Sequence, residues 1–279
     1  MNICIIPAKS HSTRIPEKNI KEFCGRPVIE YTLEAVRDSG CFDKIVVSTD
    51  SDRIGAIATR YGAIYYKRAA EFMADETPMV DAVMEVLRDE KSDYDTVCMA
   101  YACSPFIKES VIRDAYSQHE FHDADVTTAI YRSCEHAEYS MLIRDGKLIP
   151  RHPEYKDVNS NLFPDTYQNA GQFYIADVDH LSISQTLTPA NMWGVIVEHG
   201  IDIDTPEDWA RAEALYILSY HPSLMKWSMQ NAPIIAECEA MAKAAGYGSI
   251  TVNYQKGEVV AVEKAITTRQ KWGDVWGVE

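Results

Sequence analysis

Residues 3–19 read ICIIPAKSHSTRIPEKN, an apolar run that passes into a loop of small, hydroxylated and basic residues. The apolar run is typical of a buried strand, which the first proline ends. The loop carries Lys9, Arg14 and Lys18. Open α/β sheets bind their ligands at the carboxyl ends of the strands, where this loop lies. Three cations in a chain of net charge -15 indicate a polyanionic ligand, and a nucleoside triphosphate is the first candidate.

This loop matches neither of the two common glycine-rich phosphate motifs. The chain contains no Gly-x4-Gly-Lys-Ser/Thr, and residues 1–24 contain no glycine, which excludes the dinucleotide fingerprint. Phosphates would therefore be held by side-chain charge rather than by a nest of backbone amides. The alternative that the local sequence leaves open is an ordinary solvated basic loop.

The composition is that of a globular protein. The chain has 279 residues, of which 46% are hydrophobic and 25% charged. Its acidic balance argues against a nucleic-acid surface, which needs an excess of lysine and arginine. The seven cysteines include no Cys-x-x-Cys pair, which argues against a disulfide scaffold or zinc ribbon and fits a reducing compartment. No signal-peptide pattern and no apolar stretch of about 20 residues occurs, so we expect a cytoplasmic protein without membrane contact.

Strand-like runs alternate with helical patterns through the first two-thirds of the chain. This rhythm predicts an α/β fold, a doubly wound, mostly parallel, Rossmann-like sheet with helices on both faces. It breaks at about residues 133–165, where polar residues and two X-Pro breaks predict an excursion in the form of a hairpin or lid. The expected strands lie at 3–6, 44–50, 96–100, 125–131, 172–175 and 194–197, and the expected helices at 28–36, 52–61, 81–88, 108–119 and 206–219.

Residues 220–279 are expected to be an addition to a main domain at residues 1–219. The alanine-rich segment 233–245 predicts a helix, and residues 250–254 and 258–262 predict the two strands of a hairpin. We therefore expect an α+β C-terminal extension, in which no chemistry is readable.

A second polar cluster reads GIDIDTP at residues 200–206. In an extended backbone, side chains at i and i+2 share one face, so Asp202 and Asp204 converge while Ile203 packs behind them. Mg²⁺ usually takes one or two carboxylates and fills its remaining positions with water and phosphate oxygens. The alternative is that the aspartates serve as turn residues and that Thr205 or Asp204 caps the helix started by Pro206.

Further motifs accompany these two segments in order along the chain. They are Phe-x-Gly-x-Pro at 23–27, Phe-Asp-x-Ile-x-Val-Ser-Thr-Asp at 42–50 and Tyr-Gly-Ala at 61–63. With Ile-Pro-Ala-x6-Ile-Pro-x-Lys-Asn at 6–19 and Asp-Ile-Asp-Thr at 202–205, they resemble the acylneuraminate (CMP-sialic acid) cytidylyltransferases over about residues 2–218. YACSPF at 101–106 and NAGQFY at 169–174 look most like the pseudaminic acid cytidylyltransferase branch.

The resemblance implies a nucleotidyltransferase sheet and an Mg²⁺-dependent reaction in which CTP and a nine-carbon α-keto sugar acid give the CMP-sugar and pyrophosphate. It also implies a homodimer, with the excursion as the part that contacts the partner. By the same resemblance, the nucleotide would contact Ala8, Lys9, Arg14, Lys18, Asn19, Arg68 and Asp75, and the sugar acid would contact Tyr101, Arg151, Gln172 and Tyr174. Asp202 and Asp204 would hold Mg²⁺, and Lys9, Arg14, Lys18 and Asp204 would carry catalysis.

The chain also departs from the family pattern. Lys9 stands where the family usually has arginine, and an ammonium binds phosphate as a point charge rather than in a bidentate manner. Gln168 and Ala170 stand where sialic-acid-specific members carry arginine and asparagine, and Tyr139 falls where some place lysine. We therefore expect pseudaminic acid as the acceptor, with another nonulosonate or a Kdo-like acid as alternatives. A metal-dependent glycosyltransferase and a non-catalytic nucleotide or sugar-acid sensor are the alternatives from other classes.

Two expectations about geometry follow. The cations of the first loop and the aspartates at 202 and 204 must face each other across one cleft if the proposed chemistry is right. Asp50, at the end of an expected strand, either touches ligand or caps the helix that follows it.

Overall fold

The computed structural model describes residues 1–73, 77–90, 92–133, 136–230, 232, 248–255 and 258–266. The chain divides into two compact units, Met1–Ala210 and Arg211–Glu279. The boundary falls inside helix α6 (Pro206–Tyr220), and the boundary expected from the sequence lies at the end of that helix. None of the described helices is long and apolar enough to cross a membrane.

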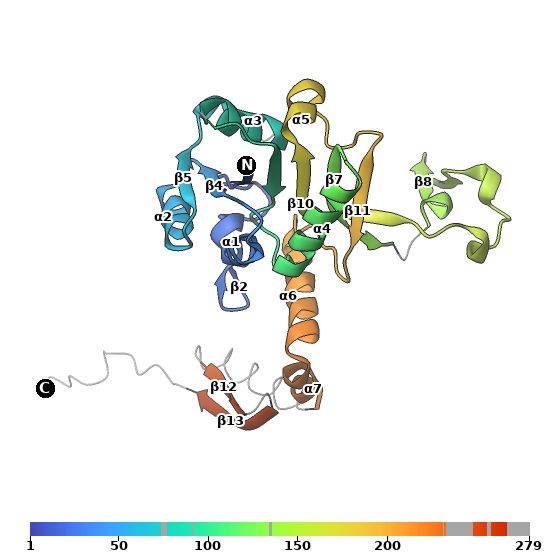
Figure 1. Cartoon of the computed structure of the whole chain (residues 1–279). Helices are drawn as coiled ribbons and strands as arrows, with labels where there is room; N and C mark the ends of the chain where they lie inside the picture. Colours follow the sequence, from blue (N-terminus) through green and yellow to red (C-terminus); the bar gives the residue numbers. More distant parts are fainter. Residues whose placement is uncertain are drawn as a thin grey trace, which may run out of the picture. The chain divides into compact units, whose positions relative to one another are not determined.

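The first unit is built on one mixed sheet (Figure 1). Among the described residues the sheet has seven strands in the order β11-β7-β10-β6-β1-β4-β5. Only β10 runs antiparallel to its neighbours, and the other pairs are parallel, so the predicted mostly parallel sheet is confirmed. The strands are β1 (Asn2–Pro7), β4 (Lys44–Thr49), β5 (Ile64–Lys67), β6 (Thr96–Ala100), β7 (Val126–Arg132), β10 (Tyr167–Asp177) and β11 (Met192–Ile196).

Strand β1 shows why the sheet is covered on both faces. Its residues 3–6 are fully buried, and successive side chains point to opposite faces. Cys4 and Ile6 join a core cluster with apolar residues of helices α1, α2 and α4, whereas Ile3 and Ile5 join a second cluster with α3 and α5. The predicted doubly wound arrangement is therefore confirmed. These helices are α1 (Val28–Ser39), α2 (Asp52–Arg60), α3 (Met79–Asp89), α4 (Glu109–Phe121) and α5 (Val178–Ser184).

The sequence patterns did not indicate β5, α5 or the short elements near the amino terminus. Strand β5 lies at the sheet edge with Ile64 48% exposed, so it lacks the apolar run of a central strand. Helix α5 has seven residues with one buried side chain, Leu181, which is too short for a helical period to show. The short elements are η1 (Lys18–Ile20), β2 (Glu22–Phe23), β3 (Arg26–Pro27) and η2 (Ala70–Phe72).

The predicted excursion lies between the paired ends of β7 and β10, where Arg132 aligns with Tyr167. It contains an antiparallel hairpin of β8 (Met141–Arg144) and β9 (Lys147–Pro150). Asp145 and Gly146 connect the strands with φ values of 51° and 75°, the left-handed pair that a two-residue hairpin turn requires. Three short helices complete it: η3 (Ala137–Tyr139), η4 (Pro153–Tyr155) and η5 (Ser160–Leu162).

The second unit contains the rest of α6 and helix α7 (Pro222–Gln230). Its β12 (Gly248–Gln255) and β13 (Glu258–Ile266) pair antiparallel, which confirms the predicted hairpin. The helix predicted at 233–245 lies outside the described residues.

Candidate active site at the carboxyl edge of the sheet

The cationic loop after β1 is held by its neighbours at several points. The backbone N–H of Ala8 donates to the carbonyl of Ser48 at 2.9 Å. The side-chain amide of Asn19 donates to the carbonyl of Lys9 at 2.9 Å. Ser10 donates from its backbone N–H (2.7 Å) and its hydroxyl (2.6 Å) to the two carboxylate oxygens of Asp50. These bonds fix a loop that has no glycine to shape it.

Asp50 therefore has a role that sequence reasoning did not assign. The helix α2 is capped by Ser51, whose hydroxyl accepts from the N–H of Ile54, so the capping role expected of Asp50 is wrong. Although burial opposes the shift, the hydrogen bonds from Ser10 and the nearby charge of Arg68 lower the pKa of Asp50. The only signal for this role in the sequence was the position of Asp50 at the end of an expected strand.

We expect Asp50→Asn to loosen the loop. For CTP, the substrate that the family resemblance implies, the KM should rise roughly three- to tenfold with a smaller change in kcat, because two charge-assisted hydrogen bonds weaken. The folded state lowers the pKa of Asp50 below 3.8, so its contribution to stability is complete above that pH and is lost as the pH falls through the folded-state pKa. Melting temperatures of both proteins from about pH 3 to about pH 8 should therefore converge at the acidic end.

Asp52→Asn is the matched control, because this neighbouring carboxylate is exposed and pairs with Lys67 at the surface. It should leave the KM for CTP unchanged. An unchanged KM in Asp50→Asn, or a stability difference that persists at acidic pH, contradicts the assignment.

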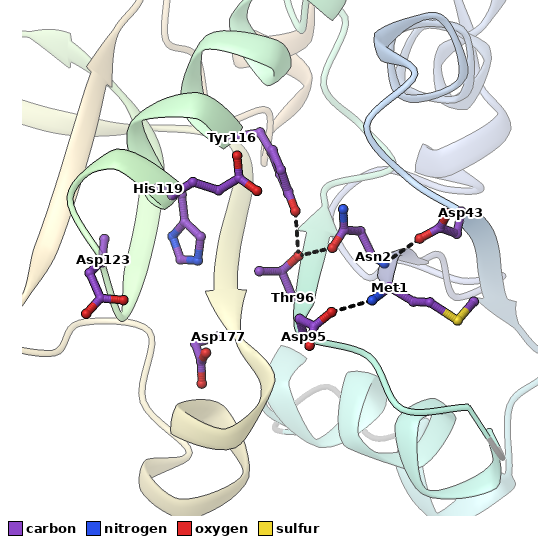
Figure 2. A pocket seen from close by; sticks show the side chains of 11 residues that line it. Met1, Asn2, Asp43, Asp95, Thr96, Tyr116, His119, Asp123 and Asp177 are labelled. Carbon is purple, nitrogen blue, oxygen red and sulfur yellow. Dashed lines mark hydrogen bonds and ion pairs between the residues drawn. The ribbon is translucent and has the colours of Figure 1, made fainter.

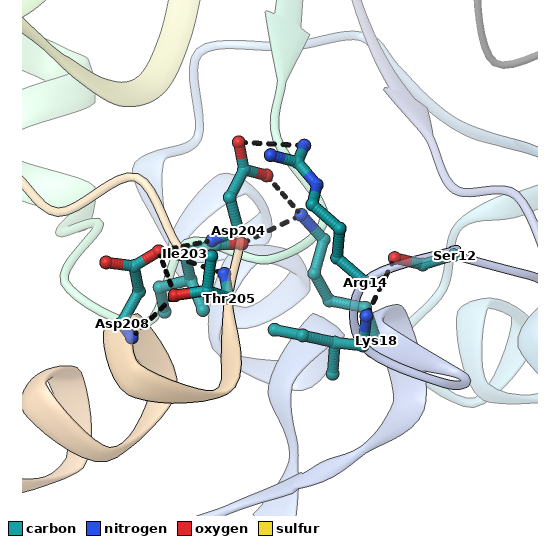
Figure 3. Close-up of polar contacts among 8 residues, drawn as sticks. Ser12, Arg14, Lys18, Ile203, Asp204, Thr205 and Asp208 are labelled. Carbon is teal, nitrogen blue, oxygen red and sulfur yellow. Dashed lines mark hydrogen bonds and ion pairs between the residues drawn. The ribbon is translucent and has the colours of Figure 1, made fainter.

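The first loop meets the 200–206 segment directly (Figure 3). The Arg14 guanidinium lies 2.9 Å from Oδ2 of Asp204, and the Lys18 ammonium lies 3.2 Å from Oδ1. Lys18 also donates to the carbonyl of Ile203 at 2.8 Å. The expected facing is therefore confirmed for Arg14, Lys18 and Asp204, although 186 residues separate Lys18 from Asp204.

A capping network leaves the Asp204 carboxylate available for these contacts. Oδ2 of Asp208 accepts from the backbone N–H groups of Asp204 (3.2 Å) and Thr205 (2.9 Å) and from the Thr205 hydroxyl (2.8 Å). The N–H of Asp208 returns a bond to the same hydroxyl. This reciprocal pairing of a cap residue with the third residue after it is a capping box. Thr205 is thus the cap, and the Asp204 side chain is not.

The segment 202–204 fits a divalent cation by the chemistry of its donors. Ile203 is buried with 1% exposure, and Asp202 beside it is exposed, as the alternation predicted. Desolvation and the neighbouring charge of Asp204 raise the pKa of Asp202, while Lys18 and Arg14 oppose this shift. No cluster of three or more metal-ligating side chains occurs among the residues that the structure describes. Two carboxylates are the set expected for Mg²⁺ whose remaining ligands are water and phosphate.

Arg68 lies close to the start of the first loop. Its Nε donates to the Ser48 hydroxyl at 3.0 Å, and its Nη2 donates to the Ser48 carbonyl at 2.7 Å, the oxygen that also accepts from Ala8. Burial lowers the pKa of Arg68, and the charges of Glu85 and Asp50 oppose the shift. Ala8 and Arg68, two of the nucleotide-binding candidates, thus both bind Ser48. Asp75, the other candidate beyond the first loop, lies outside the described residues.

The sugar-acid candidates fall into two groups. Tyr101 and Tyr174 have ring centroids 6.4 Å apart, and burial raises the pKa of both phenols, with the Asp202 charge contributing. A bulge in β10 places Gly171, with φ of 63°, against Asp202. Both rings therefore lie near the aspartate segment as neutral hydrogen-bond donors.

Gln172 and Arg151 are placed differently. Gln172 is 2% exposed, its Nε2 donates to the carbonyl of His199 at 3.2 Å, and its Oε1 is buried with no hydrogen-bond partner. This hydrogen bond ties the Gln172 side chain to the segment that contains His199. Contact between Gln172 and a sugar acid stays a prediction. Arg151 follows β9 in the excursion, where its backbone N–H donates to the carbonyl of Ser140, and its contact with an acceptor also stays a prediction.

Cys103 lies in the same region. Burial raises the pKa of its thiol to about 12, with Lys18 lowering and Asp202 raising it. A thiol with this pKa carries almost no thiolate at neutral pH.

A cavity opens at the amino edge of the sheet, opposite to the candidate site (Figure 2). It has a volume of about 510 Å³, and its walls include Asp43 and Asp95, which precede β4 and β6. Buried His119 lines it and shares a 3.1 Å hydrogen bond between Nδ1 and the Thr127 hydroxyl. Burial lowers the pKa of His119 despite the surrounding carboxylates. None of the residues predicted from the sequence for the active site lines this cavity.

Sequence comparisons identify the family to which the chain belongs. The profile of the Cytidylyltransferase family matches residues 3–182. The chain belongs to this family. A pseudaminic acid cytidylyltransferase of Campylobacter jejuni is 30% identical over 227 residues, which cover 78% of this cytidylyltransferase and 97% of that protein. A CMP-N,N'-diacetyllegionaminic acid synthase of Legionella pneumophila is 31% identical over 226 residues, again 78% and 97% of the two chains. The predicted family and its pseudaminic branch are confirmed, and the chain is a CTP-utilising nucleotidyltransferase.

Solved structures of low sequence identity share the fold of this cytidylyltransferase. CMP:2-keto-3-deoxy-manno-octonic acid synthetase, complexed with CTP, has a TM-score of 0.60 at 16% identity and covers 78% of this chain and 99% of its own. A 4-diphosphocytidyl-2C-methyl-D-erythritol synthase of Anaerococcus prevotii has a TM-score of 0.52 at 18% identity, with 77% and 95% covered. The predicted Rossmann-like nucleotidyltransferase sheet is thus confirmed.

Proposed function

We propose that this enzyme transfers CMP from CTP to the anomeric hydroxyl of a nonulosonic acid, with Mg²⁺ bound and pyrophosphate released. The observation that carries the proposal is the contact of Arg14 and Lys18 with Asp204 at the carboxyl edge of the sheet. We propose pseudaminic acid as the acceptor, on the grounds of the pseudaminic relative and the YACSPF and NAGQFY segments. The legionaminic relative is as similar, so it defines the main competing acceptor.

The residues at this edge suit nucleotidyl transfer without a covalent intermediate. The reaction needs the acceptor oxygen in line with the leaving pyrophosphate and needs the phosphate charge neutralised. Lys9, Arg14 and Lys18 would supply positive charge where pyrophosphate leaves. Asp202 and Asp204 would hold Mg²⁺, which when bound supplies Lewis-acid polarisation of phosphate oxygens. Tyr101 and Tyr174 would donate hydrogen bonds to the acceptor.

Pyrophosphate release tests this proposal. The protein is incubated with CTP, with or without Mg²⁺, and with pseudaminic, legionaminic, N-acetylneuraminic or Kdo acid. We expect release with pseudaminic acid that exceeds release with the other three and that EDTA abolishes. Faster release with another acid corrects the acceptor. CTP binding with no pyrophosphate release from any of the four acids contradicts the proposed class of acceptor.

We further propose that the excursion joins two copies of the chain. Ile143 and Leu148 are directly paired across the β8–β9 hairpin and are 76% and 71% exposed. Met141, on the same face of β8, is 57% exposed. Adjacent exposed apolar side chains of this kind mark interaction sites, and a second copy is the partner that the family resemblance implies.

Light scattering after gel filtration tests the dimer. We expect the native chain to have twice the mass of one chain at micromolar concentration, and Ile143→Lys to shift it toward the monomer because a charge enters an apolar contact. Lys147→Gln, at the hairpin turn, is the control that should stay dimeric. A monomeric native protein, or a dimer that Ile143→Lys leaves unchanged, contradicts this surface.

A further inference from the structure

The Asp204 carboxylate has cationic partners on both of its oxygens. Arg14 occupies Oδ2 at 2.9 Å and Lys18 occupies Oδ1 at 3.2 Å. Figure 3 shows both cationic side chains reaching Asp204 from the first loop. Lys18 is further tied to the carbonyl of Ile203 at 2.8 Å, and 21% of its side chain is exposed. Asp204 is thus neutralised by the groups that are proposed to bind phosphate.

This pairing has opposite consequences for the two ligands of the proposed site. A divalent cation that binds Asp204 alone must share this carboxylate with Arg14 and Lys18 or displace them, and in either case three positive groups lie close together. A triphosphate that binds alone must draw the same cations away from Asp204, and it leaves that carboxylate facing the phosphates. When both ligands bind, Arg14 and Lys18 pair with the phosphates and the Asp204 carboxylate binds the metal. Each charged group then has a partner of opposite charge.

We infer that Arg14 and Lys18 compete with the divalent cation for Asp204, so that metal and triphosphate bind with positive linkage. The inference rests on the proposed function, because it takes the metal and triphosphate sites from there. Linkage is reciprocal: whatever the nucleotide adds to metal affinity, the metal adds to nucleotide affinity. Either ligand alone therefore meets a site in which Arg14 and Lys18 already neutralise Asp204.

Two substitutions should strengthen binding of one ligand in the absence of the other. Arg14→Met should raise the affinity for Mn²⁺ without nucleotide about two- to fivefold, a modest gain because a half-exposed ion pair is weak. Asp204→Asn should raise the affinity for CTP in EDTA by a similar factor, since it frees both cations and removes a charge that repels phosphate. Both changes run against the usual loss when a binding-site residue is removed.

The measurements are Mn²⁺ titration by electron paramagnetic resonance without nucleotide and CTP titration by calorimetry in EDTA. Arg53→Gln is the control, because Arg53 is 72% exposed and pairs with Glu17 rather than with an aspartate of the site. It should leave both affinities unchanged. Circular dichroism melting checks that each variant is folded.

The outcomes separate this inference from the function on which it rests. If Arg14→Met leaves Mn²⁺ affinity unchanged or lowers it while Asp204→Asn abolishes Mn²⁺ binding, the metal site is right and the competition is overturned. If Asp204→Asn binds Mn²⁺ as well as the native protein does, the metal site itself is wrong, and both proposals are overturned.

Discussion

Asp204→Asn is expected to lower the turnover of pyrophosphate release by roughly a hundredfold or more, because the proposed metal loses a carboxylate ligand and the developing charge on the phosphates loses its stabilisation. The substitution is nearly isosteric, and the cap of α6 rests on Thr205 and Asp208. The fold should therefore survive with a melting temperature close to that of the native protein.

Steady-state rates at saturating CTP and acceptor give this measurement. Glu207→Gln is the matched control, since it removes a nearby negative charge from an exposed residue in the first turn of the same helix. It should keep near-native turnover. Near-native turnover in Asp204→Asn itself, with the protein folded, would show that this aspartate does not hold the metal.

Lys18→Met is expected to lower kcat/KM for CTP by about a hundredfold. The ammonium has two tasks, since it joins the first loop to the Ile203 carbonyl and the Asp204 carboxylate, and it is proposed to neutralise the triphosphate. Methionine keeps the length and the apolar part of the side chain, so the loss reports the charge and its hydrogen bonds.

The kinetic constants for both substrates separate the two tasks. We expect the KM for CTP to rise while the KM for the sugar acid changes little, because the contacts of Lys18 lie with the loop and the aspartate segment. Lys44→Met is the control, because this lysine begins β4 at the opposite edge of the sheet and pairs with Glu90. If Lys18→Met raised the KM for both substrates equally, the variant would report a general disturbance of the fold rather than a lost contact with the nucleotide.

The sequence was sufficient for most strands of the sheet, for most of its covering helices and for the family. Buried strands such as β1 and β6 are continuous apolar runs, and the helices carry apolar residues at helical spacing. These patterns are local, so each can be recognised within a short stretch of the sequence. The edge strand β5 and the short helix α5 were not predicted, because neither buries enough apolar surface to produce a recognisable spacing of apolar residues. The residue types of the site were also readable, because a cationic loop and an Asp-x-Asp segment are local as well.

The amino-acid sequence by itself thus determined which side chains are available for chemistry, namely Lys9, Arg14, Lys18 and the aspartates at 202 and 204. Tertiary structure alone decided which of them meet. The contact of Lys18 with Asp204 and the bonds from Ser10 to Asp50 join residues 186 and 40 positions apart. Such pairings arise because parallel strands end at one edge of the sheet and bring their following loops together there. No local pattern carries that information, since the register of distant strands is set by burial across the whole sheet.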